Sequence, residues 1–150
     1  MTLKNTKENA TIELVSRQSS GELSNKIEFI SDGGYYERDG KTYITYREHR
    51  DMGMGDSRVV LKIDGNTVTM RRMGEFQTVM VYKNGEVTDF NYRVPFGEMS
   101  IKIRTQRIEN CLGSEGGNLA IDYLLFVGSE VTKNEILIKV KMNYSGETEE

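Results

Sequence analysis

The chain has 150 residues, a formal net charge of −3 and a pI near 5.4, which fit one domain and argue against a nucleic-acid binder, because that class is usually strongly basic. Its single cysteine, Cys111, excludes an internal disulfide and favours a reducing compartment. The first nine residues are polar, unlike a signal peptide, and no later segment is long and apolar enough to span a bilayer, so we expect a cytoplasmic protein without a membrane partner.

The sequence predicts one β domain, residues 10–145, between a polar tail (1–9) and an acidic tail (146–150). Residues 10–18 alternate between apolar and polar side chains, which predicts a half-buried strand. A longer strand follows over residues 23–38. Gly33-Gly34 interrupts that strand and predicts a bulge or a sharp bend.

Three dipeptides, Asp39-Gly40, Asp64-Gly65 and Asn84-Gly85, predict two-residue hairpin turns. Residues equidistant from such a turn lie opposite each other on one face. The first turn predicts a buried face of Ile27, Phe29, Tyr35, Ile44, Tyr46 and Glu48, and the second groups Val59, Leu61, Val68, Met70 and Arg72 on one face. Around the third turn, the set Phe76, Met80, Tyr82 and Val87 competes with the set Val79, Val81, Phe90 and Tyr92, and the faces stay open.

The second half of the chain begins with a corner at residues 94–97, because Pro95 fixes its own φ and biases Val94 to an extended conformation. Residues 98–110 then alternate cleanly, with Ile101, Ile103 and Thr105 on one side. Two similar runs follow, over residues 118–128 and 134–144. The second half therefore predicts a three-strand meander with one solvent-exposed face.

The fold class that follows is all-β, a single antiparallel meandering β-barrel of about 8–10 strands. No segment has a helical period with caps, and strands recur about every ten residues with turn signals between them. A sheet of this length must curl or split, and short hairpins leave little chain for Greek-key crossings. Such a barrel either holds one small ligand or is filled by side chains.

Four short motifs occur in order along the chain: residues 43–48 (YITYRE), 70–74 (MRRMG), 92–97 (YRVPFG) and 117–123 (GNLAIDY). Together they resemble the YwiB-like family of small bacterial proteins. The resemblance implies a calycin-like (lipocalin-like) barrel and a bacterial cytoplasmic setting, with no catalytic residues to carry over. The chain has no tryptophan, whereas true lipocalins carry a Gly-x-Trp near the first strand, so their transport function is not carried over.

The sharpest candidate site is a pair of charges, Glu48 and Arg72, that the hairpin register directs into the barrel. Charges in an apolar interior need partners. We expect Arg72 to offer a forked donor to a polar or anionic ligand, Tyr35 and Tyr46 to supply hydroxyls, and Phe96 to form a wall. The alternative is a structural salt bridge, or two rim residues that reach water.

Other chemistry has weaker support. The loop of residues 48–56 contains the only histidine, His49, but a zinc site needs three or four ligands and no second histidine or cysteine pair exists, so we predict neither a metal nor another cofactor. Cys111 and His49 give no sign of a nucleophile and base, and no catalytic residue is predicted. Leu124 and Phe126 fall on an outward face, which suggests a weak homodimer as the alternative to a monomer.

The sequence thus favours a non-enzymatic protein that binds a small molecule in the interior or mouth of its barrel. The alternative is a protein-interaction or structural module whose barrel is filled. An enzyme is the least supported class, because only Glu48, His49 and the tyrosines have suitable side chains.

Overall fold

The computed structural model of the protein describes residues 8–49, 56–74, 77–94 and 96–143. Within these residues the chain forms ten antiparallel strands, which confirms the predicted fold class. The strands are β1 (Ala10–Ser20), β2 (Leu23–Arg38), β3 (Lys41–Glu48), β4 (Ser57–Asp64), β5 (Thr67–Gly74), β6 (Thr78–Lys83), β7 (Val87–Val94), β8 (Gly97–Gly113), β9 (Gly116–Val127) and β10 (Glu130–Met142). Residues 1–7 and 144–150 of the expected tails, most of the loop 48–56, Phe76 and Pro95 lie outside the described residues.

The strands form a nearly closed barrel in which the first and last strands pair with each other. The order across the sheet is β6-β5-β4-β3-β2-β1-β10-β9-β8-β7, so nearly every strand pairs with its neighbours in sequence. β1 pairs with β10 over ten residues, from Ala10 opposite Met142 to Ser19 opposite Lys133. The order ends at β6 and β7, and no ladder joins these two strands among the described residues.

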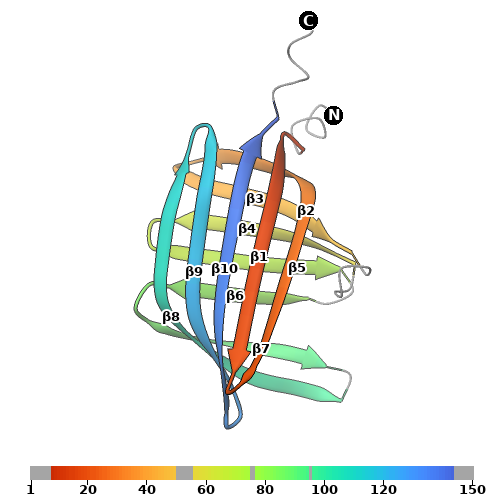
Figure 1. The fold of residues 1–150 in the computed structure, drawn as a ribbon, viewed down its shortest axis with the longest axis vertical. Helices are drawn as coiled ribbons and strands as arrows, with labels where there is room; N and C mark the ends of the chain where they lie inside the picture. Colours follow the sequence, from red (N-terminus) through yellow and green to blue (C-terminus); the bar gives the residue numbers. More distant parts are fainter. Residues whose placement is uncertain (1–7, 50–55, 75–76, 95, 144–150) are drawn as a thin grey trace, which may run out of the picture.

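The barrel is flattened into two layers whose strands cross (Figure 1). β1, β8, β9 and β10 run along the molecule, whereas β3 to β6 run across them. β2 belongs to both layers, because it pairs with β1 as far as Gly33 and with β3 from Gly34 onward. A Cβ at position 33 would lie 2.2 Å from the carbonyl oxygen of Thr45, so only glycine fits at this corner. The predicted bend is confirmed.

The first hairpin has the predicted register. The second turns at Gly65-Asn66, one residue later than Asp64-Gly65, so that Asp64 pairs with Thr67; this shift changes the pairing partners but keeps the same side chains on the buried face. Asp39 and Gly40 both have positive φ, 54° and 79°, as a tight hairpin turn requires. Tyr35 lies opposite Ile44, and Val59 lies opposite Arg72. The residues of both predicted faces point inward, and all of them except Ile27 and Arg72 are buried.

The meander of the second half is also confirmed, with one local irregularity. Ile101, Ile103 and Thr105 are buried on the inner face of β8. A bulge between Thr105 and Arg107 then shifts the register with β9, and Ile108 becomes the next side chain that packs against the core. The interior between the layers is filled by apolar side chains from nearly every strand, including Ile12, Ile44, Leu61, Leu119, Ile121 and Ile138.

The corner between β6 and β7, which we call the seam, differs from a simple hairpin. The Asn84-Gly85 turn exists, since Glu86 N donates to Lys83 O over 2.9 Å, but the two strands separate beyond it (Figure 1). β8 binds the turn instead, through Gly85 N to Thr105 O at 2.9 Å and Thr105 N to Glu86 O at 3.0 Å.

The face assignment that the sequence left open therefore mixes the two competing sets. Met80, Tyr82 and Phe90 pack toward the core, whereas Val79 and Val87 are exposed.

The part of the chain that the structure describes contains no helix with the length and apolar character needed to cross a lipid bilayer.

Candidate functional site

The predicted inward charges form a buried, forked ion pair. Arg72 Nε donates to Glu48 Oε1 over 2.7 Å, and Arg72 Nη2 donates to Glu48 Oε2 over 2.9 Å. Only 2% of the Glu48 side chain and 22% of the Arg72 side chain are exposed. Arg72 lies in one cross-strand row with Tyr46, Val59 and Thr78, so its guanidinium crosses β4 to reach the carboxylate on β3.

The ion pair keeps Arg72 charged in spite of its burial. Desolvation alone would lower the pKa of Arg72, but the hydrogen bonds and the negative charge of Glu48 outweigh it and the pKa is raised. Two parallel charge-assisted bonds also fix the orientation of the guanidinium. The pair is therefore a rigid polar feature in an apolar interior.

Three buried tyrosines lie close to the ion pair. Burial, and next the charge of Glu48, raises the pKa of Tyr46. Burial raises the pKa of Tyr82 well above its usual value, and burial also raises the pKa of Tyr123. The rings of Tyr82 and Tyr123 are 4.8 Å apart between centroids. We call Glu48, Arg72, Tyr46, Thr78, Tyr82 and Tyr123 the polar cluster.

Of this cluster, the sequence predicted Glu48, Arg72 and Tyr46 as site residues and missed Thr78, Tyr82 and Tyr123. Tyr82 belongs to the hairpin whose faces were left open. Tyr123 carried a usable signal, because it alternates with the buried Leu119 and Ile121 on β9.

Two other predicted site residues lie away from the ion pair. Tyr35 is on the correct face, but it lies opposite Ile44, four residues before Glu48 and therefore roughly 13 Å away along β3. Its hydroxyl donates to the carbonyl oxygen of Gly113 over 2.6 Å. Phe96 is 81% exposed between β7 and β8, and its role as a wall beside the ligand stays a prediction.

A cleft of about 730 Å³ opens at the seam, next to the polar cluster. We call it the seam cleft; its lining residues are Arg71, Arg72, Met73, Gln77, Thr78, Val79, Val81, Asp89, Phe90 and Glu98. Arg72, Thr78 and Phe90 belong to the inner face of the wall, whereas Arg71 and Val79 are exposed on its outer face. The cleft therefore runs through the wall, from the surface to Arg72.

Arg72 retains donor capacity toward this cleft. A guanidinium has five N–H groups, of which Nε and Nη2 serve Glu48. Within the described residues, Nη1 makes only a long contact of 3.4 Å to the Thr78 hydroxyl, and Thr78 itself lines the cleft. Since hydrogen bonds of this length are weak, an acceptor in the cleft can bind Nη1 without breaking the ion pair.

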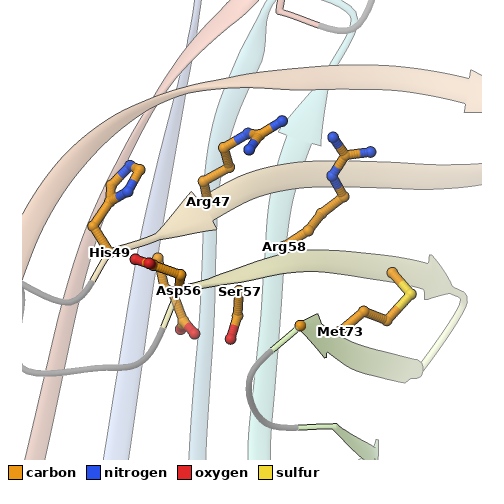
Figure 2. Close-up of a pocket in the computed structure, with 8 residues that line it drawn as sticks. Arg47, His49, Asp56, Ser57, Arg58 and Met73 are labelled. Atoms are coloured by element: carbon orange, nitrogen blue, oxygen red, sulfur yellow. The ribbon is translucent and has the colours of Figure 1, made fainter.

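A second hollow, of about 440 Å³, lies at the ends of β3, β4 and β5 (Figure 2). His49 and Ser57 line it, and the Ser57 hydroxyl is buried without a hydrogen-bond partner among the described residues. Residues 50–55, which belong to the same predicted loop, lie outside the described part of the chain. In the part that is described, no three His, Cys, Asp or Glu side chains are grouped as metal ligands.

Comparisons with known proteins agree with the fold and with the predicted resemblance. Residues 12–138 match the family described as Domain of unknown function (DUF1934). The chain is 31% identical over 122 residues to the uncharacterized beta-barrel protein YwiB of Bacillus subtilis (strain 168), a match that covers 81% of this chain and 82% of that protein. The crystal structure of the ywiB protein from Bacillus subtilis is similar at a TM-score of 0.81 and 25% identity, and covers 95% of this chain and 99% of that chain.

Proposed function

The chain belongs to the DUF1934 family of β-barrel proteins, and from the geometry of its seam cleft we propose that it is a non-enzymatic protein that binds a small molecule at the mouth of the barrel. The ligand enters between β6 and β7 and places a hydrogen-bond acceptor, such as a carboxylate or carbonyl oxygen, on Arg72 Nη1. The observation that carries the proposal is the buried Glu48–Arg72 pair, whose remaining donor lies beside Thr78 of the cleft.

The size and lining of the seam cleft support this mode of binding. Its volume of about 730 Å³ falls within the range of about 300 to 1,000 Å³ that is typical of small-molecule sites. Val79, Val81 and Phe90 supply apolar surface, while Arg72 and Thr78 supply a few fixed polar groups. Arg71 adds a positive charge to the outer rim, and Asp89 and Glu98 add two carboxylates, so the donor that selects an acceptor oxygen is Nη1 of Arg72 rather than a net positive charge.

The packing at the centre of the barrel favours a binding site at the mouth over one in the interior. Ile44, Val59, Leu61, Ile103 and Ile121 are buried there against one another. A ligand at the centre would displace several of these side chains, whereas the seam cleft needs no such change. The proposed compartment is the cytoplasm, in keeping with a free, exposed Cys111.

The test is a titration of ¹⁵N-labelled protein with acetate, butyrate and benzoate, followed by NMR. We expect the Arg72 Nε–H signal and the amides of Val79 and Val81 to shift together. Arg71→Gln should weaken carboxylate binding by up to about fivefold, and Arg38→Gln, on an exposed hairpin turn outside the cleft, should leave it unchanged.

Native mass spectrometry of protein isolated gently from its own cells provides an independent readout. A bound mass that the Thr78→Val variant loses and the Thr69→Val variant keeps would support the proposal, because Thr78 lines the cleft and Thr69 does not. An apo mass, together with no shift of the Arg72 signal by any carboxylate, would overturn it.

A second candidate function, a contact between two copies of the chain, is favoured by an apolar strip on the outer face of β9 and β10. Leu137 and Val131 are 42% and 46% exposed, and Leu124 and Phe126 lie on the same outward side because Tyr123 points inward. Burial of this strip in a dimer would remove apolar surface from water. Light scattering on the native chain and on Phe126→Asp tests it, since a native chain that is already monomeric excludes the dimer.

A further inference from the structure

The outer surface of β3 to β6 is basic, although the whole protein carries a net charge of −3. The outward-facing positions of these four strands contain one carboxylate, Asp64 beside a turn. The same positions contain six basic side chains, which are Lys41, Arg47, Arg58, Lys62, Arg71 and Lys83. Positive charge is therefore concentrated on one side of the molecule.

Two of these side chains, Arg47 and Arg58, lie directly opposite each other on β3 and β4. Both are exposed, and Figure 2 shows that they extend in the same direction from the two strands. No ion pair or hydrogen bond joins either guanidinium to another side chain in the described part of the chain. Like charges placed directly opposite each other destabilise a sheet, so this arrangement suits an anion that both arginines bind.

A hollow of about 440 Å³ lies beside this arginine pair, outside the corner where β2 bends. We call it the outer hollow; Tyr36, Thr45, Val60, Arg47, Arg58 and Asp32 line it, together with Glu8. The Tyr36 ring stacks on the Tyr43 ring, with centroids 5.3 Å apart and planes 12° from parallel. The outer hollow thus combines a fixed aromatic ring, two guanidiniums and two carboxylates.

We propose that the outer hollow binds a free nucleotide, with its phosphate on Arg47 and Arg58 and its base against Tyr36. Guanidiniums bind phosphate oxygens through charge-assisted hydrogen bonds, and aromatic side chains stack on bases. The carboxylates of Asp32 and Glu8 are acceptors for the hydroxyls of the ribose or an amino group of the base. None of the lining residues belongs to the seam cleft, so the nucleotide site can be tested independently of the proposed carboxylate site.

Isothermal titration calorimetry with AMP, adenosine and ribose 5-phosphate tests the site. We expect AMP to bind more tightly than either fragment. The double variant Arg47→Gln/Arg58→Gln should weaken AMP binding by about 100-fold, at about tenfold for each charge-assisted contact. Tyr36→Leu should weaken AMP by about tenfold and leave ribose 5-phosphate unchanged.

The matched control is Arg104→Gln, which removes an exposed arginine from β8 on the other layer and should leave AMP binding unchanged. The arginine variants should fold, because both side chains are exposed, and their melting temperatures should equal or exceed that of the native chain. Equal affinity of AMP for the native chain and the double variant, or no binding at millimolar AMP, would overturn the proposal. Much tighter binding of a six-residue oligoadenylate than of AMP would replace the free nucleotide with single-stranded RNA and would also overturn it.

Discussion

Replacement of Arg72 by methionine tests how far the Glu48–Arg72 pair is removed from water. The change keeps the length of an apolar stem and removes the guanidinium that donates both hydrogen bonds to Glu48. The carboxylate then stays in a site where 2% of its side chain is exposed. An unpaired charge in such a site costs about 3 to 5 kcal/mol of folding free energy.

For a chain of this size, each kcal/mol corresponds to about 2 to 4 °C in the melting temperature, so we expect Arg72→Met to melt about 6 to 20 °C below the native protein. The double variant Glu48→Leu/Arg72→Met removes both charges. It should be more stable than Arg72→Met by at least about 2 kcal/mol, because a buried ion pair is no better for stability than apolar side chains of similar volume.

Urea denaturation followed by circular dichroism measures both variants. An unchanged slope with denaturant would show that the loss is one of stability and not of compactness. Glu28→Gln provides the control, because the exposed Lys26–Glu28 pair should contribute less than about 1 kcal/mol. A cost below about 1 kcal/mol for Arg72→Met would refute the reasoning, since the Glu48 carboxylate would then have access to water.

Three further predictions concern the interior. Burial raises the pKa of Tyr46 and of Tyr82 above that of an unfolded tyrosine, near 10, so the unfolded state loses protons first as the pH rises. The free energy of unfolding should therefore fall above about pH 10 by about 1.4 kcal/mol per pH unit for each tyrosine. In urea titrations Tyr46→Phe should flatten this fall, and a stability that stays constant up to pH 11 would contradict the prediction. Thr105→Val removes a buried hydroxyl that has no hydrogen-bond partner in the part of the chain that the structure describes, and it should raise stability by about 1 kcal/mol in the same assay. A loss of stability would mean that the hydroxyl is hydrogen-bonded. Gly33→Ala places a Cβ 2.2 Å from the Thr45 carbonyl oxygen and should lower the free energy of unfolding by about 3 kcal/mol. The control Gly113→Ala, with open space around the added Cβ, should lower it by less than about 0.5 kcal/mol. Equal melting temperatures of the two variants would contradict the close approach at the corner.

The parts of the fold that depend on local geometry were predictable from the sequence. Asp39-Gly40 fixes the register of its hairpin. The second turn lies at Gly65-Asn66, one residue from the predicted position, and this shift leaves the same side chains of β4 and β5 facing the core. This is why Glu48 and Arg72, on different strands, were both predicted to point inward and are found paired.

The seam was not predictable, because its cause lies far away in sequence. Asn84-Gly85 has the same turn signal as the other two hairpins, but Thr105 of β8 takes up backbone groups of the turn and the following strands separate. The rule that residues equidistant from a turn share one face therefore fails for residues 78–90. Thr78 and Tyr82, which complete the polar cluster, were missed for this reason.

The same rule predicts which face a side chain is on, but not how far it lies from other side chains on that face. Tyr35 was correctly placed inside the barrel, but its position along the strand puts its hydroxyl on Gly113 of β8 and not on Arg72. Net charge has a similar limit. A total of −3 conceals the basic outer surface of β3 to β6, because the pairing of strands, and not composition, decides which charges become neighbours.

The ladder between β1 and β10 has a consequence for how the chain can be rearranged. It brings the two ends of the barrel domain together, where Asn143 N donates to Asn9 O over 2.9 Å. If a short linker joined these ends and the chain were cut between Asn84 and Gly85, the circular permutant would retain every strand ladder, since none crosses the seam in the described residues. The order of synthesis would change while the barrel stayed the same, with its new termini beside the seam cleft.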